Sequence, residues 1–72
     1  MSRLHELQND IETLEYSKRR VLRRLAELEE MGLTHSPEFK ALEEQIRVCN
    51  NNIRAIEAEM IRLEERRLEE AV

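Results

Sequence analysis

The 72-residue sequence has one glycine, one proline and one cysteine, and its only aromatic residues are Tyr16 and Phe39. The single cysteine, Cys49, cannot form an internal disulfide, which is typical of a reducing compartment. With so few aromatic residues, the chain offers no series of rings on which nucleotide bases could stack. The scarcity of glycine also excludes a glycine-rich phosphate loop.

Long hydrophobic runs are absent as well. No segment approaches the roughly 20 consecutive apolar residues of a membrane-spanning helix, and residues 1–6 lack the apolar core of a signal peptide. The formal net charge is −4, so the chain has no overall attraction to nucleic acid or to anionic lipid. We therefore expect a cytoplasmic protein whose partners are neither nucleic acids nor membranes.

The abundant residues are charged (39%) or hydrophobic (40%), and the hydrophobic ones are regularly spaced. They recur every three or four residues, as at positions a and d of a heptad repeat, so they predict a helix at about 2–31 and another at about 37–70. In the first helix these positions hold Leu4, Ile11, Lys18 and Leu25 (a) and Leu7, Leu14, Val21 and Leu28 (d). In the second they hold Phe39, Ile46, Ile53 and Met60 (a) and Leu42, Cys49, Ile56 and Leu63 (d).

The turn at 32–36 contains a helix stop signal followed by a start signal. Gly32 suits the left-handed position after a helix end, with Leu33 folding back onto Leu28. Ser36 followed by Pro37 is a typical helix start. Such a short connection predicts antiparallel neighbours. The expected fold is all-α, a single helical-hairpin domain over 1–72 that forms a two-helix antiparallel coiled coil, with residues from about 64 onward projecting beyond the first helix.

The weakest layer of this coiled coil pairs Lys18 with Cys49, next to the polar run Asn50-Asn51-Asn52. Asparagine is a poor helix former, and a polar residue at position a commonly fixes the register of two helices. We interpret this layer as a register determinant, with a hinge or a partner contact as the alternative.

No residue pattern predicts catalysis. His5 and His35 are far apart in the expected hairpin, and neither has a second histidine or a cysteine at metal-ligand spacing. At position d, Cys49 is interpreted as a small buried hydrophobic residue. We expect no catalytic residues, no metal and no cofactor, and a protein that is not an enzyme.

The densest charged cluster is basic. Its arginines form two rows along one helix and are Arg19, Arg20, Arg23 and Arg24. They predict either a solvated helix face or a contact with an acidic protein surface.

Several apolar residues lie outside positions a and d, namely Leu22 (e), Val48 (c), Ile61 and Leu68 (b). A two-helix unit is marginally stable alone, so these residues favour further association. We expect Leu22, Val48 and Ile61 to bind a partner protein, with the arginine cluster setting its orientation. The expected assembly is a homodimer forming a four-helix bundle, with a different protein as the alternative partner.

The charges beside positions a and d also favour association. In the antiparallel register Glu29 lies beside Glu43, and Glu15 beside Glu57, so like charges meet along one edge. That edge is expected to face basic groups, for example residues 19–24 of a second copy.

Three families of helical hairpins are similar in plan. The plasmid-copy-number RNA-binding dimers resemble this chain in architecture, but their basic and aromatic RNA-binding face has no counterpart here. The small co-chaperones of type III secretion needle subunits are similar in length and in the helix–turn–helix plan. That resemblance implies a chaperone-like role in binding a secreted subunit.

The third resemblance is to the small aspartyl-phosphate phosphatases of the sporulation phosphorelay. It rests on Gly32-Leu33-Thr34, on Ser36-Pro37-Glu38 and on the apolar spacing that follows. The family's functional Ser and Asp, four residues apart, correspond here to Glu43 and Arg47. The resemblance thus implies a hairpin that binds response regulators without phosphatase activity. From the residues themselves, the expected function is a non-enzymatic protein–protein interaction module.

Overall fold

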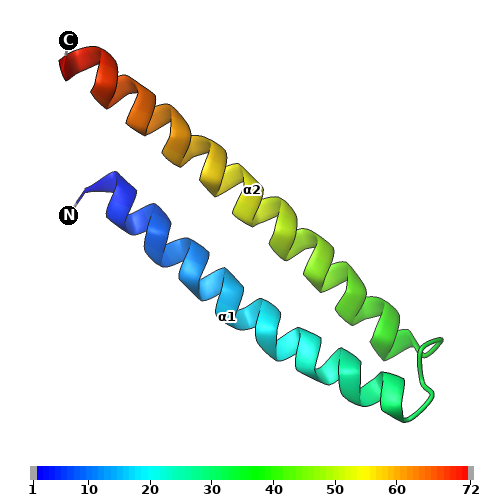
Figure 1. The fold of residues 1–72 in the computed structure, drawn as a ribbon. Helices are drawn as coiled ribbons and strands as arrows, with labels where there is room; N and C mark the ends of the chain where they lie inside the picture. The colour runs from blue at the N-terminus through cyan, green and yellow to red at the C-terminus, as the bar shows by residue number, and fades with distance from the viewer. Residues whose placement is uncertain (1, 72) are drawn as a thin grey trace.

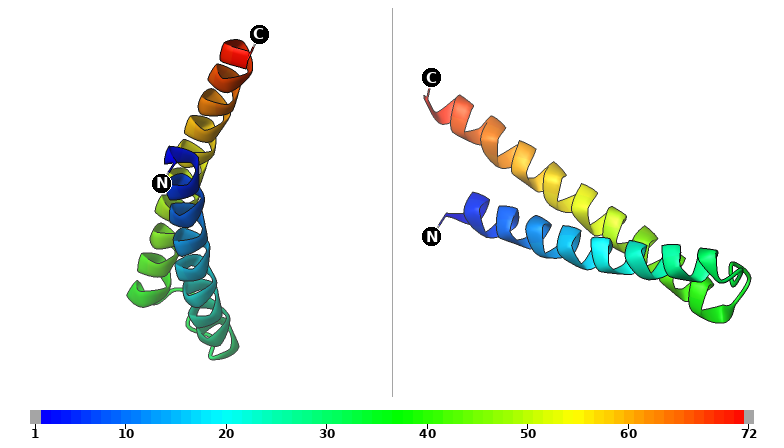
Figure 2. Two further views of the ribbon diagram at one scale, coloured as in Figure 1. Left: turned by 90° about the vertical axis from the view of Figure 1, so that its left-hand side faces the viewer. Right: turned by 60° about the horizontal axis from the view of Figure 1, so that its bottom comes forward.

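The computed structural model describes residues 2–71, which form two antiparallel helices, α1 (Arg3–Glu30) and α2 (Pro37–Ala71) (Figure 1). The molecule is a rod with extents of 58 × 18 × 14 Å. The helices are inclined to each other, as the two further views show (Figure 2). The predicted all-α hairpin is therefore confirmed, while Met1 and Val72, the ends of the predicted domain, lie outside the described residues.

Both ends of helix α1 are capped by hydrogen bonds. The Ser2 hydroxyl accepts a hydrogen bond from the His5 N–H at 3.2 Å, which satisfies one free donor of the first turn. At the other end, the Leu33 N–H donates to the Leu28 carbonyl at 2.8 Å and the Gly32 N–H to the Glu29 carbonyl at 3.0 Å. This pair of bonds is the Schellman motif, and it needs a residue with positive φ, which Gly32 supplies at +73°.

Helix α2 starts directly after this motif. The Ser36 hydroxyl accepts from the Phe39 N–H at 3.2 Å and donates to the Leu33 carbonyl at 2.8 Å. Pro37 occupies the first helical position, where its missing N–H costs no hydrogen bond. Because Leu33 takes part in both caps, the end of α1 and the start of α2 are held in one compact turn.

The core is a single seam between the two helices. Every residue at positions a and d of both helices, from Leu4 to Leu63, is buried or half-buried, including Lys18. Among the residues described, only Leu7 and Leu28 are fully buried, each with 1% of its surface exposed. The heptad register predicted from the sequence is thus the one observed, but most of the seam keeps contact with solvent.

At the open end, α2 extends past the start of α1 (Figure 1). Near this end, Arg66, Arg67 and Glu70 of α2 line a depression together with Arg3 and Leu4 of α1. The segment after Leu63, which was predicted to project beyond the first helix, therefore borders the start of α1 on one side.

Candidate interaction surfaces

The seam has two sides, which we name by their charges. The bridged edge consists of the g positions, which are Arg3, Asp10, Ser17 and Arg24 on α1 and Glu38, Gln45, Asn52 and Glu59 on α2. The acidic edge consists of the e positions, which are Gln8, Glu15, Leu22 and Glu29 on α1 and Glu43, Asn50, Glu57 and Glu64 on α2. Heptad geometry places these two sets on opposite sides of the seam.

Two ion pairs join the helices along the bridged edge. Arg24 donates to both carboxylate oxygens of Glu38, with Nε–Oε1 at 2.8 Å and Nη2–Oε2 at 3.3 Å. Arg3 binds Glu59 in the same way, at 3.1 and 3.3 Å. Hydrogen bonding from Arg24 lowers the pKa of the Glu38 carboxyl, and the hydrogen bonds that Arg24 donates to Glu38 and Glu27 raise the pKa of Arg24. Each pair has the forked geometry that makes arginine–carboxylate contacts directional.

The two ion pairs coincide with the two fully buried leucines. Leu28 lies one helical turn after Arg24, and Leu7 lies one turn after Arg3. On a helix, residues four apart are neighbours, so each ion pair starts one turn before a fully buried leucine. Ion pairs therefore span the bridged edge near both ends of the hairpin.

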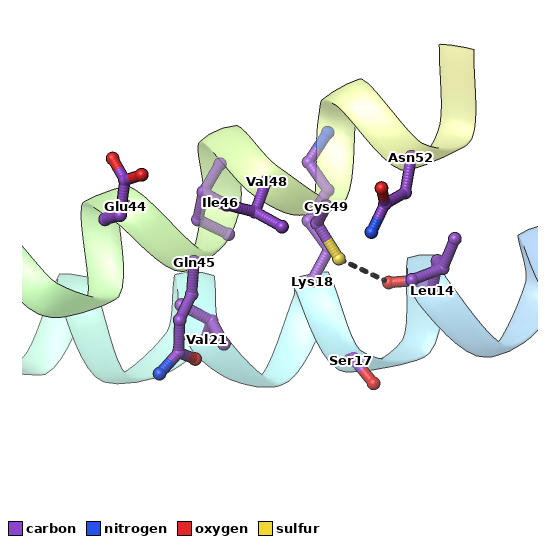
Figure 3. Close-up of a pocket in the computed structure, with 10 residues that line it drawn as sticks. All are labelled: Leu14, Ser17, Lys18, Val21, Glu44, Gln45, Ile46, Val48, Cys49 and Asn52. Carbon is purple, nitrogen blue, oxygen red and sulfur yellow. Dashed lines mark hydrogen bonds between the residues drawn. The ribbon is translucent and has the colours of Figure 1, made fainter. Parts of the chain in front are cut away.

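Between the two ion pairs the bridged edge opens into the central groove, of about 340 Å³ (Figure 3). Its apolar residues are Leu14, Val21, Ile46, Val48 and Cys49, and its polar ones are Ser17, Lys18, Glu44, Gln45 and Asn52. The g positions here hold Ser17 and Gln45 in place of an arginine and a glutamate. A serine is too short to cover the seam, so the apolar floor stays accessible.

Cys49 lies in this groove, half-buried. Its sulfur points toward α1 and donates to the Leu14 carbonyl at 3.5 Å (Figure 3). Lys18 lines the same groove from α1 and is half-buried too. The predicted polar layer is therefore part of the central groove, next to its apolar floor.

The acidic edge lacks such bridges: within residues 2–70 no ion pair joins α1 to α2 along it. Near the open end it forms a second groove, of about 360 Å³, lined by Gln8, Ile11, Glu57, Met60, Ile61 and Glu64. Like charges facing each other across a helix pair weaken its closure. On this side, the two helices are joined by the apolar contacts of the seam and by no ion pair among the described residues.

The apolar residues predicted to bind a partner do not share one surface. Leu22, Val48 and Ile61 are all exposed, at 44%, 45% and 56%. Val48 lines the central groove on the bridged edge, whereas Ile61 lines the groove on the acidic edge. Leu22 is itself an e position on the acidic edge. The structure therefore separates Val48 from Leu22 and Ile61.

The predicted arginine cluster is also divided. Arg24 is engaged by Glu38 and, through a 3.0 Å contact, by Glu27. Arg20 lines a shallow depression beside the central groove. Arg19 and Arg23 are exposed on the outer face of α1. Arg24 is thus paired with α2, while Arg19, Arg20 and Arg23 remain exposed.

The cross-helix ion pairs are not among the features predicted from the sequence. The like charges at the e positions do not reveal them, because the ion pairs lie at the g positions. Those hold arginine at Arg3 and Arg24 and glutamate at Glu59 and Glu38, which is the signal that identifies both pairs.

Among residues 2–70, no group of three or more histidine, cysteine or carboxylate side chains could hold a metal ion. His5 and His35 are exposed. Arg47 pairs with Glu44, and hydrogen bonding from Arg47 lowers the pKa of that carboxyl.

No family model, no curated protein and no solved structure matches this chain. Neither of the helices, over the residues described, contains a stretch long and apolar enough to cross a membrane.

Proposed function

We propose that this chain is a non-enzymatic protein–protein interaction module that works by helix-face association, and that its first partner is a second copy of itself. Two hairpins together would form a four-helix bundle. In such a bundle, side chains that are half-buried in one hairpin become core residues shared by both.

The observation that carries this proposal is the shortage of buried surface. A compact monomer of 8.6 kDa is expected to expose about 4,700 Å², whereas this chain exposes 5788 Å². The excess, about 1,100 Å², is comparable to the roughly 800 Å² that each partner buries in a typical specific interface. A second hairpin packed over the seam would bury an area of this size.

The layering of the fold supports the same proposal. Stable domains bury the apolar side of each element between at least two packed layers, whereas this hairpin is one layer of two helices. Its buried residues, Leu7 and Leu28, lie near its two ends. A second hairpin over the middle of the seam would complete the core there.

Solution mass measured by light scattering over a concentration series tests this function. We expect a mass near twice 8.6 kDa at high concentration, with dissociation on dilution accompanied by loss of helical circular dichroism. A monomer that stays folded and melts cooperatively at every concentration would contradict self-association.

A further inference from the structure

We propose that the second copy docks on the bridged edge, over the central groove, with a two-fold axis along the length of the bundle and both turns at the same end. This inference rests on the proposed function, because it names the face and the orientation of the self-association. In this arrangement α1 of one copy packs antiparallel against α2 of the other.

Charge complementarity selects the bridged edge over the acidic edge. A two-fold axis along the bundle doubles each layer of charges at the same height. On the bridged edge the layer of Arg24 and Glu38 becomes a ring of two arginines and two glutamates in alternation. On the acidic edge the layer of Glu15 and Glu57 becomes four carboxylates. Like charges meeting at an interface are strongly unfavourable, so in this arrangement the acidic edge faces solvent, in place of the basic groups of a second copy that the sequence led us to expect there.

The surface beside the central groove is also suited to close helix packing. Along α2 an uncharged strip follows the helical repeat and consists of Ala41, Gln45, Val48, Asn52 and Ala55, all of them exposed. Thr13 and Ser17 continue it on α1. In this chain 39% of the residues are charged, and burying a charged group costs a large desolvation free energy. An uncharged strip beside an apolar groove is therefore the surface whose burial costs least.

The c positions show the fit between copies. Within one hairpin, residues at the same height have numbers that sum to 67, as for Leu28 and Phe39. A two-fold axis along the bundle keeps these heights, so each c position comes closest to the c position of the other copy that brings the sum nearest to 67, which is 68. The resulting pairs join Glu6 to Arg62, Thr13 to Ala55, Arg20 to Val48, and Glu27 to Ala41. One pair is oppositely charged, and none is like-charged.

The opposite orientation fits poorly. If the turns pointed to opposite ends, α1 would pack against its own copy in antiparallel fashion. With the perpendicular axis placed beside the central groove, at the height of Arg20, this residue would meet its own copy and Asp10 would approach Glu27. Electrostatics therefore favours turns at the same end.

Substitutions at Val48 test the docking face. Because Val48 is expected to face Arg20 of the other copy, V48R places two like charges together at two symmetric contacts, and we expect the dissociation constant to rise at least about tenfold. V48E places a carboxylate against the same arginine, and we expect the dimer to persist. Light scattering gives the mass, and circular dichroism checks that each variant remains helical.

Leu22 supplies the matched control, because its exposure of 44% nearly equals the 45% of Val48. L22R should leave the dimer intact. If L22R dissociates the dimer and V48R does not, the docking face is wrong although self-association stands. If the wild-type chain is monomeric throughout, the proposed self-association fails and this inference fails with it.

A disulfide tests the orientation without weakening the fold. In a Cys49→Ser background, Thr13→Cys and Ala55→Cys together place one thiol at a c position of each helix, on the proposed docking face. Within one hairpin these c positions point away from the seam, so the two thiols are too far apart to bond. We expect oxidation to give a covalent dimer that a reducing agent reverses. Failure to cross-link while the mass remains dimeric would overturn the shared-end orientation.

Discussion

The bridged edge and the acidic edge flank the same seam, are equally long, and differ chiefly in which charges face each other. On the bridged edge, arginine faces glutamate near each end, and the leucine below each pair is fully buried. On the acidic edge, two of the four layers hold a carboxylate on each helix, and the neighbouring a positions are half-buried. The seam is therefore sealed where long oppositely charged side chains cross it.

From this difference we infer that the ion pairs act mainly by shielding the apolar seam beside them. Exposed ion pairs contribute little to stability by themselves. The aliphatic stem of an arginine, however, shields apolar surface whenever its charged end is held in place. We expect the coupling between the ion pair and the buried leucine to be the property that distinguishes the two edges.

The largest expected effect comes from the buried leucines. Leu28→Ala should lower the free energy of unfolding by about 3 kcal/mol, because it leaves a cavity beneath the Arg24–Glu38 pair. Leu25→Ala, at a half-buried a position that leans toward the acidic edge, should cost only about 1–2 kcal/mol. Urea denaturation at one protein concentration measures both. Equal losses would mean that the two edges are sealed alike.

An intermediate effect is expected at the turn, which sets the register for both edges together. Gly32→Ala should cost about 1 kcal/mol, because alanine is strained at a φ of +73°. No atom lies within 4 Å of the added methyl group, so the cost is confined to the backbone. Thermal melting should show a lower midpoint with an unchanged salt dependence. A changed salt dependence would show that the charges on one edge have moved.

A smaller effect is expected from correcting the charges of the acidic edge. Glu43→Lys places a cation opposite Glu29 and should stabilise the hairpin by about 0.5 kcal/mol, or about 2–4 °C in melting midpoint. Glu65→Lys makes the same change of charge on the outer face of α2 and serves as the control. If the melting midpoint rises equally in both variants, the cause is the smaller net negative charge. The charges of the acidic edge would then not distinguish it from the bridged edge.

The smallest effect is the pH dependence of the bridged edge. Because Arg24 lowers the pKa of Glu38 below its ordinary value of 4.5, this ion pair stabilises the folded state at neutral pH. Its contribution should be lost as the pH falls from 4.5 through the lowered pKa. Melting of the wild-type protein and of Glu38→Gln from neutral pH downward measures it. Parallel curves for the two proteins would show that Glu38 contributes nothing.

Much of the fold could be predicted from the sequence because it is encoded locally. Ser2, Gly32 and Ser36 end or start helices through hydrogen bonds to residues within one or two turns. The spacing of leucine and isoleucine then identifies the seam, since helical geometry alone places those positions on one face. Such signals need no knowledge of the other helix.

The candidate surfaces were less predictable, because each arginine had several possible partners. Arg24 has Glu27 on its own helix, and Arg3 has Glu6, yet each also reaches a glutamate of α2. The choice depends on the distance between the helices after folding. The exposed apolar residues are different in this respect, because their heptad positions, c for Val48 and e or b for Leu22 and Ile61, already place them on two sides of the seam.

The sequence by itself determined two helices, the turn between them and the residues of the seam, because capping and periodicity are properties of neighbouring residues. Only the tertiary structure decided that the seam is sealed at Leu7 and Leu28 and open at the central groove between them. Sealing requires side chains from both helices to meet at one height. That meeting is set by the register and separation of the helices, which no local signal contains.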